Sequence, residues 1–280
     1  MMSSSDLNSL KDKALMVRLE TLRLTRIAGA GHYGGAFSCV ELLVALYYHQ
    51  MRVDPTRPTW ADRDRFILSK GHAAIGLYPI LADLGFYATS ELDTYTRFGS
   101  AFGDHPDMRR VVGVDFSSGS LGHGLSIGLG MALAARVSER SYRTYVMVGD
   151  AELDEGQVWE AAMAAGHFRT GRLVCIVDRN GLGIDGPTEM LMAVEPIEER
   201  FAAFGWQTSR VDGHDLGAVV LALEHVGDDE LGPPQLIVAD TVKGKGVGRM
   251  EHDKSWHVGN LGPEDYDEVV RELTEARRAQ

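Results

Sequence analysis

The sequence predicts an α/β fold, a doubly wound parallel sheet with helices on both of its faces. Two short apolar runs, 145–148 and 173–177, are bounded by turn residues, as the buried strands of a parallel sheet usually are. An alanine-rich segment from about 155 to 168 lies between them and is typical of a connecting helix. Strands that alternate with helices in this way predict a sheet that is covered on both sides.

The first half of the chain begins with a predicted helix over 6–28, where leucines recur at helical spacing. Ser38 and Glu41 have the spacing of a capping box, which predicts that a helix begins at Ser38 and continues through Tyr48. The other elements expected in this half are a strand at 65–68, a turn at Gly71-His72, a loop at 98–118 and a glycine-rich helix near 122–138.

The second half continues the alternation beyond the two central runs. Further strands are predicted at 206–211 and 235–239, and Gly213-His214-Asp215 opens a helix between them. A short helix at 196–204 and a charged helix at the end of the chain complete the pattern. No Ser/Gly/Pro tract, repeat or low-complexity run divides the chain, so we expect a single domain over 1–280.

The composition is that of an acidic globular protein, with 44% hydrophobic residues and a formal net charge of −12. A nucleic-acid-binding surface needs clustered Lys and Arg, so the charge argues against that class. The longest apolar stretch, near 125–135, is interrupted by Ser and Gly and is too short to span a membrane. Cys39 and Cys175 resemble buried thiols, and residues 1–13 carry no signal peptide, so we expect a cytoplasmic protein.

Asp150 and Asn180 each follow one of the two central apolar runs. A strand–helix–strand crossover is almost always right-handed, so both strands end at the same edge of the sheet, where ligands bind. The two side chains offer the hard oxygen atoms that Mg²⁺ prefers, and the Leu182 carbonyl lies in a turn between two glycines. The spacing therefore predicts a magnesium ion that holds a diphosphate. The alternative is that both residues only serve turns, which is their commoner role.

Histidines beside glycines favour the ligand interpretation. His32, His72 and His105 each adjoin a glycine or a Gly-Asp turn, where the backbone can approach a ligand closely. Imidazole is also the side chain best suited to proton transfer near neutral pH. We expect His49, His225 and His252, in contrast, to be ordinary surface or core residues.

The central stretch reads GDAELDEGQVWEAAMAAGH at 149–167 and VDRNGLGIDGPTE at 177–189. It resembles the thiamine diphosphate motif, in which Gly-Asp-Gly is followed about thirty residues later by Asn. It is more closely similar to the N-terminal subunits of split transketolases. Four further blocks follow the order of that family: GHYGGAFSCVELLVALYY (31–48), ILSKGHAAIGLY (67–78), GDHPDMRRVVGVDFSSGSLGHGLSIGLGMALA (103–134) and TVKGKGVGRMEHDKSWH (241–257).

The resemblance implies a cofactor site made by several blocks. Asp150, Asn180 and the Leu182 carbonyl would be the magnesium ligands, and the Ala151 amide and the His72 ring would contact the diphosphate. Gly119 and Leu121 would lie against the aminopyrimidine ring. The implied cofactor-binding residues are therefore His72, Gly119, Leu121, Gly149, Asp150, Ala151, Glu152, Asn180 and Leu182.

The resemblance also implies catalytic roles. His32, His72, His105 and His257 would line the channel to the thiazolium carbon, bind substrate hydroxyls and move protons. Glu155 matches a Glu of a carboxylate network that links the two cofactor sites of the family's assemblies.

Two residues depart from the family pattern. Ala151 replaces the second glycine of Gly-Asp-Gly, and it would cost about 1 kcal/mol or more if that position needed a positive φ. His123 stands where the family commonly has Gln, beside the expected pyrimidine pocket. Neither departure removes an expected metal ligand.

We therefore expect the N-terminal subunit of a thiamine diphosphate- and magnesium-dependent transketolase, which moves a two-carbon ketol unit from a ketose or ketose phosphate to an aldose. The Glu that activates the aminopyrimidine lies in the family's pyrimidine-binding domain, which this chain does not resemble. A C-terminal partner subunit is therefore expected, in a heterotetramer with two copies of each chain. Two alternatives are a pathway-specific relative with a non-standard donor or acceptor, and a catalytically silent scaffold.

Overall fold

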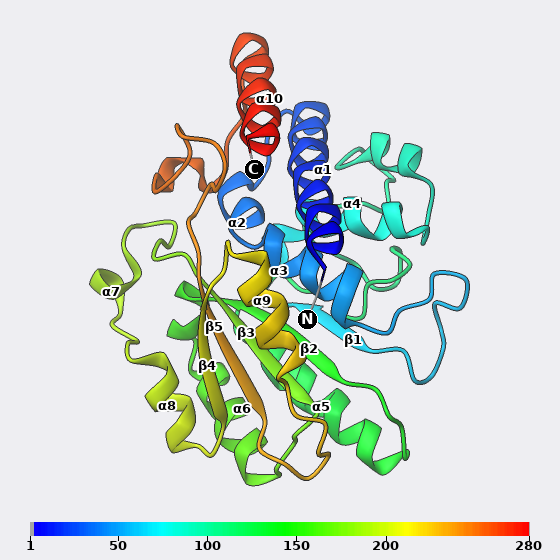
Figure 1. Ribbon diagram of the computed structural model, residues 1–280, viewed down its shortest axis with the longest axis vertical. Helices are drawn as coiled ribbons and strands as arrows, with labels where there is room; N and C mark the ends of the chain where they lie inside the picture. The colour runs from blue at the N-terminus through cyan, green and yellow to red at the C-terminus, as the bar shows by residue number, and fades with distance from the viewer. Residues whose placement is uncertain (1–2, 280) are drawn as a thin grey trace.

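The computed structural model describes residues 3–279 and contains a five-stranded parallel sheet with the strand order β1-β2-β3-β5-β4 (Figure 1). Its strands are β1 (Arg65–Leu68), β2 (Thr144–Gly149), β3 (Leu173–Arg179), β4 (Gln207–Asp212) and β5 (Gln235–Asp240). Each strand expected from the sequence is present within a residue or two. The predicted doubly wound α/β fold is confirmed.

Helices cover both faces of the sheet, and each face has its own apolar core (Figure 1). One face carries α1 (Ser4–Ala28), α3 (Val40–Ala45), α4 (Ala74–Leu84) and α9 (Leu216–Glu224). The other carries α5 (His123–Val137), α6 (Gly156–His167) and α8 (Ile197–Ala203). The side chains of β2, β3 and β5 are almost all buried, because a parallel strand between two helical layers meets no solvent.

Shorter elements complete the chain: α2 (Tyr33–Ser38), a π-helical turn (Leu46–Gln50), α7 (Thr188–Leu191) and 3₁₀ turns at Gly71–Ala73, Thr89–Thr94, Ala151–Asp154 and Lys254–His257. The charged helix α10 (Pro263–Arg278) packs against α1 at the top of Figure 1. No helix within residues 3–279 combines the length and the apolar character needed to cross a membrane. Cys39 and Cys175 are both buried free thiols, as expected.

The predicted capping box at Ser38 is wrong. Ser38 is the last residue of α2, and the next helix, α3, begins at Val40 without a side-chain cap. The Ser38 hydroxyl instead donates to the buried carboxylate of Asp178 at 2.6 Å. An N-cap residue needs a non-helical backbone, and Ser38 lies within α2 instead.

The parallel arrangement directs four strand ends toward one edge of the sheet. The turn at Gly71 follows β1, Asp150 follows β2, Asn180 follows β3 and the segment from Thr241 follows β5. These are the blocks that the sequence singled out, so the fold itself brings them together.

Candidate active site

Asp150 and Asn180 lie close together at the carboxyl ends of β2 and β3. The Gly181 amide donates to Oδ2 of Asp150 at 2.7 Å, and the Ala151 amide donates to Oδ1 of Asp150 at 3.0 Å. The Leu182 amide donates to Oδ1 of Asn180 at 3.2 Å. Gly181 has a φ of +77°, so the tight turn that presents Leu182 depends on this glycine.

This group of oxygen atoms suits a divalent cation. Asp150 is 1% exposed, and burial together with the nearby Asp178 carboxylate raises the pKa of the Asp150 carboxyl. The closest cation is the Arg179 guanidinium, at 3.5 Å from Oδ2 of Asp150. A carboxylate, an amide oxygen and a carbonyl are hard ligands, as Mg²⁺ requires. Within residues 3–279 no cluster of three or more His, Cys, Asp or Glu forms a metal cage, so an ion here would need oxygens from a ligand or water.

A buried ion pair forms the floor of this site. Lys70 and Asp178 are 2% and 0% exposed and pair directly. Lys70 also donates to the Gly35 carbonyl at 2.8 Å, and the Asp178 carboxylate accepts from the hydroxyls of Ser38 and Thr241. The Lys70 ammonium holds the pKa of Asp178 below its usual range although burial opposes this. Neither residue was predicted from the sequence. The only signal was that Lys70 directly precedes Gly71-His72 and that Asp178 lies two positions before Asn180.

Lys243 is a second cation that the sequence reasoning missed. Its Nζ donates to the Leu182 carbonyl at 3.0 Å and lies 3.0 Å from Nδ1 of His257. Lys243 is 2% exposed, and burial together with the charge of Lys70 lowers the pKa of Lys243 to about 8. The signal that could have found Lys243 was a lysine shortly after the last strand, next to Gly244.

The four histidines expected to be catalytic form one cluster. The ring centroid of His32 lies 5.3 Å from that of His72, 5.4 Å from that of His257 and 6.1 Å from that of His105. The rings of His72 and His257 are 5.2 Å apart. Residues from four distant blocks therefore meet at one place.

Two of these rings are neutral near pH 7. Burial and the Lys70 charge lower the pKa of His72 well below its usual value. Burial and the adjacent Lys243 lower the pKa of His257 to about 4. A neutral imidazole can donate one hydrogen bond and accept another, so both rings can bind hydroxyl groups and pass protons.

Carboxylate and loop contacts fix the other two histidines. Nδ1 of His32 lies 3.1 Å from Oδ1 of Asp104, and the Tyr95 hydroxyl donates to the same oxygen at 3.2 Å. His105 borders Gly119, where an added Cβ would lie 3.4 Å from Cδ2 of the His105 ring. The glycine-rich segment with Gly119 therefore adjoins the cluster, and neither Asp104 nor Tyr95 had been predicted.

The acidic residues of the 149–155 turn have different surroundings. The carboxylate of Glu152 is turned inward, where it accepts from the Ser69 hydroxyl and from the amides of Gly122 (2.8 Å) and Gly149 (3.0 Å). It therefore ties this turn to the start of α5. Glu155 is exposed, directly before α6, and packs beside Gly122.

The two departures from the expected pattern cause no visible strain. The non-glycine residues with positive φ in the described part of the chain are Thr96, Glu139, Arg169 and His252. Ala151 has no positive φ and begins a 3₁₀ turn, so the conditional cost of its methyl group does not apply. His123 is the exposed first residue of α5, and Leu121 is partly buried two residues before it.

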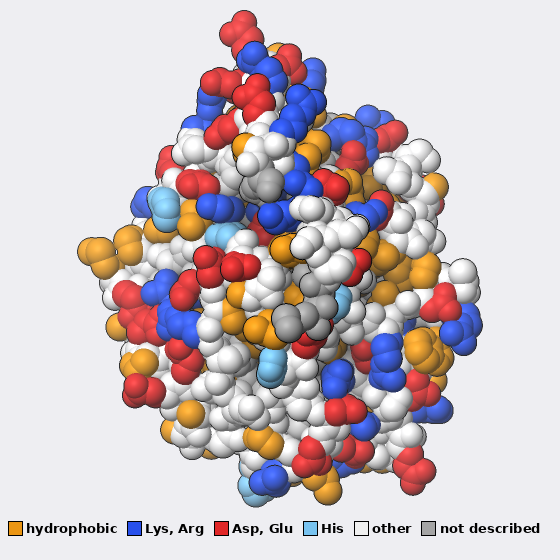
Figure 2. All heavy atoms as spheres, in the orientation of Figure 1, with side chains coloured by type: hydrophobic (Ala, Val, Ile, Leu, Met, Phe, Trp, Pro, Cys, Tyr) orange, Lys and Arg blue, Asp and Glu red, His pale blue; other side chains and the backbone are white. Residues whose placement is uncertain are grey.

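One face of the molecule is mixed in charge. On the face shown in Figure 2, Lys and Arg side chains are interspersed with Asp and Glu, without a continuous basic area. This distribution differs from the clustered cations of nucleic-acid-binding surfaces.

Comparisons with known proteins point to one family. The family described as "Transketolase, thiamine diphosphate binding domain" matches residues 11–276. An apulose-4-phosphate transketolase subunit of Phocaeicola vulgatus is 43% identical over 248 residues, which are 89% of this chain and 88% of that protein. The 6-deoxy-6-sulfo-D-fructose transketolase subunit SqwG of Clostridium sp. (strain MSTE9) is 41% identical over 264 residues, or 94% of this chain and 96% of that protein.

A solved structure of similar fold is the transketolase of Campylobacter jejuni. It superimposes with a TM-score of 0.88 at 28% sequence identity, and the match covers 99% of this chain. The same match covers 43% of the solved chain, so the likeness extends over less than half of that enzyme.

Proposed function

This chain belongs to the transketolase family and matches the family's thiamine diphosphate binding domain, and we propose that it is the N-terminal subunit of a two-chain transketolase. The observation that carries the proposal is the meeting of Asp150, Asn180 and Leu182 with a cluster of four histidines at one sheet edge. Relatives of 43% and 41% identity are named as transketolase subunits, which supports a division of the enzyme between two chains.

The residues at the strand ends fit the diphosphate end of the cofactor. Asp150, the amide oxygen of Asn180 and the Leu182 carbonyl would hold Mg²⁺, whose remaining ligands would be diphosphate oxygens and water. The Ala151 amide, the His72 ring and the Lys243 ammonium would face the diphosphate. Gly149 shapes the same turn, while Gly119 and Leu121 would lie along the aminopyrimidine. When bound, thiamine diphosphate supplies the nucleophilic carbon and the electron sink that ketol transfer requires.

The histidine cluster supplies hydrogen bonds and proton transfer. Neutral His72 and His257 can each accept a proton from a substrate hydroxyl and return it, since neither carries a charge near pH 7. Asp104 orients His32 through Nδ1 and leaves its Nε2 for substrate. The side chain of His105 is 43% exposed, against 15% for His32, so His105 is placed to meet the substrate at the entrance.

The rest of the active site would come from a C-terminal partner subunit that binds the aminopyrimidine. The exposed carboxylate of Glu155 at the start of α6 is available to a second subunit, as the proposed network between cofactor sites requires. We propose two copies of each chain in the assembly. We also propose that residues 1–280 form one domain and that the protein works in the cytoplasm, a reducing setting that suits its two buried thiols.

The donor would be a ketose or ketose phosphate and the acceptor an aldose. The names of the two relatives refer to apulose 4-phosphate and to 6-deoxy-6-sulfo-D-fructose, so similar subunits serve different sugars. This observation favours a second candidate, a pathway-specific transketolase with its own donor or acceptor. Both candidates use the same cofactor chemistry and the same residues of this chain.

Calorimetry of thiamine diphosphate and Mg²⁺ binding tests the proposal, with and without a C-terminal transketolase subunit from the same organism. We expect binding that appears or tightens at least about tenfold with the partner, a change of about 1.4 kcal/mol. Asp150→Ala should abolish it. If neither condition gives binding while the two chains still associate, the scaffold alternative replaces the enzymatic one.

A further inference from the structure

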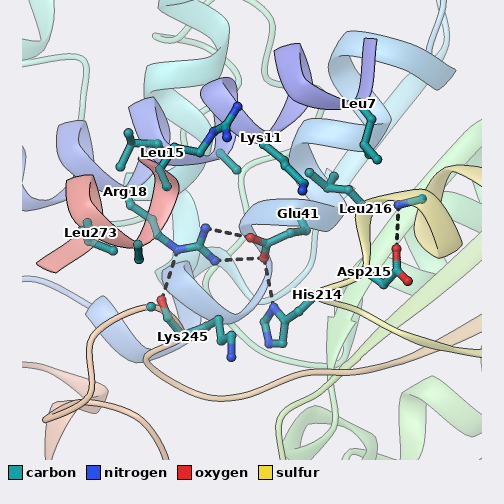
Figure 3. A pocket seen from close by; sticks show the side chains of 15 residues that line it. Leu7, Lys11, Leu15, Arg18, Glu41, His214, Asp215, Leu216, Lys245 and Leu273 are labelled. Carbon is teal, nitrogen blue, oxygen red and sulfur yellow. Dashed lines mark hydrogen bonds and ion pairs between the residues drawn. The ribbon is translucent and has the colours of Figure 1, made fainter. Parts of the chain in front are cut away.

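His214 lies outside the candidate active site, on the wall of a cavity of about 440 Å³ between α1, α9 and α10 (Figure 3). Its Nδ1 is 3.0 Å from Oε2 of Glu41, and its Nε2 accepts a hydrogen bond from the Val242 amide at 2.8 Å. An imidazole nitrogen that accepts an N–H bond cannot carry a proton itself. His214 is therefore the Nδ1-protonated tautomer, which donates to the Glu41 carboxylate.

Glu41 is in turn held by a buried guanidinium. Arg18 donates to both oxygens of Glu41, at 2.7 and 2.9 Å, as Figure 3 shows. The same guanidinium donates to the carbonyls of Phe37 at 3.3 Å and Lys245 at 3.1 Å. The three side chains thus bond to the backbone at two points of one segment, the Val242 amide and the Lys245 carbonyl.

Lys243 stands between these two fixed points. Its side chain runs from the clamped backbone into the candidate active site, where Nζ reaches the Leu182 carbonyl and the His257 ring. An added Cβ on Gly34 would lie 2.8 Å from Cγ of Lys243, so the stem has little freedom to adopt another path. The position of the ammonium is therefore sensitive to a small displacement of the backbone at Val242.

We propose that His214 is a positioning residue: with Glu41 and Arg18 it fixes the backbone on both sides of Lys243 and so places the ammonium for an anionic ligand. The inference rests on the proposed function, because Lys243 is taken there to face the cofactor diphosphate. A role in starting α9 does not account for His214, since the helix is capped by Asp215, whose carboxylate accepts from the amides of Gly217 and Ala218.

Two substitutions at His214 separate positioning from general stability. In His214→Gln, the glutamine side chain reaches about as far as Nε2 of the original histidine, so its amide oxygen can accept from the Val242 N–H. In His214→Asn, the shorter asparagine side chain reaches only as far as Nδ1 of the original histidine. It can therefore donate to Glu41 but leaves the Val242 N–H without its acceptor. The exposed His225, whose ring bonds only to its own helix, provides the matched control His225→Asn.

The measurement is the thiamine diphosphate dissociation constant in the presence of Mg²⁺ and the C-terminal subunit, with thermal melting of each variant. We expect His214→Asn to raise the dissociation constant about tenfold, as the loss of one well-placed charged contact does. His214→Gln should change it less than about threefold, and His225→Asn should leave it unchanged.

A double-mutant cycle with Lys243→Ala decides whether His214 acts through Lys243. In the Lys243→Ala background we expect His214→Asn to have no further effect on the dissociation constant. If His214→Asn weakens binding by the same factor in both backgrounds, or has no effect in the unmodified protein, the inference is overturned while the proposed function stands. If the unmodified protein with its partner binds no cofactor, the proposed function fails and the inference fails with it.

Discussion

Lys70 and Asp178 form an ion pair beneath the candidate active site, with side chains only 2% and 0% exposed. The two residues are 108 positions apart in the sequence, and their further bonds reach the Gly35 carbonyl and the hydroxyls of Ser38 and Thr241. The pair thus joins the turn before His72, the end of β3 and the segment after β5. Burial, together with the Lys70 charge, lowers the pKa of His72 well below its usual value.

Removing the lysine of this pair should strongly destabilise the fold. Lys70→Met leaves the Asp178 carboxylate buried without its cation, which typically costs about 3–5 kcal/mol. Urea unfolding of the chain measures the loss, with Lys254→Met at the surface as a control. The double variant Lys70→Met/Asp178→Asn should recover a large part of the stability, because no lone charge remains buried. Equal stability of the single and double variants would contradict this account.

Asp150→Asn should separate metal binding from folding. The asparagine has nearly the same shape and retains one oxygen for the Gly181 or Ala151 amide, while repulsion from Asp178 disappears. We therefore expect a change in unfolding free energy within about 1 kcal/mol. Binding of thiamine diphosphate should lose its dependence on Mg²⁺ and weaken at least about a hundredfold, close to 2.7 kcal/mol.

Titration with Mg²⁺ at fixed cofactor and partner concentration measures this effect. Thr188→Val is a suitable comparison, because its hydroxyl touches Oδ2 of Asp150 at 3.3 Å but is no proposed ligand. An Asp150→Asn variant that still binds the cofactor only when Mg²⁺ is present would argue against Asp150 as a metal ligand.

The Arg18–Glu41 pair should make stability depend on pH in the acid range. Burial alone would raise the pKa of Glu41, but the Arg18 charge and the bond from His214 lower it from 4.5 to about 2. A carboxyl whose pKa is lower in the folded state stabilises the fold above the unfolded pKa. This stabilisation, about 3 kcal/mol, should be complete above pH 4.5 and lost as the pH falls toward 2.

Other carboxylates titrate in the same range, so the comparison with Glu41→Gln is needed. Denaturant unfolding at several pH values should show the variant less stable than the unmodified chain near neutral pH. The difference should shrink steadily below pH 4.5, because the neutral glutamine cannot lose a charge. A difference that stays constant down to pH 2.5 would show that Glu41 has an ordinary pKa in the folded state.

The elements and the close approach of Asp150 and Asn180 could be predicted because their signals are local. Asp150 and Asn180 each end an apolar strand, and the crossover rule places both at one edge. The capping box at Ser38 was also predicted from a local signal, but it does not form. The Ser38 hydroxyl donates instead to Asp178, which lies 140 positions away in the sequence.

The floor and walls of the site could not be predicted in this way. The partners of Lys70, Lys243, Asp104 and His214 lie on other elements, and no periodicity links a residue to a partner that only the fold brings near. Charged residues of this kind look like surface residues in a sequence, because a buried lysine is rare unless it is paired. The burial of Lys243 becomes evident only when the strand order places β5 beside β3.

Compared with the glycine usual at this position of the Gly-Asp-Gly motif, Ala151 should leave cofactor binding unchanged and slightly stabilise the fold. Ala151 has no positive φ, and its methyl group lies 3.6 Å from where a Cβ on Gly183 would be, so it fits beside that turn without strain. Ala151→Gly adds freedom to the unfolded chain and should lower the unfolding free energy by about 0.5–1 kcal/mol. Urea unfolding measures this, and calorimetry with the partner subunit should give a cofactor dissociation constant within about twofold of the unmodified protein. If the glycine instead tightens cofactor binding severalfold, the methyl group obstructs the diphosphate, and the departure from the motif has a functional cost.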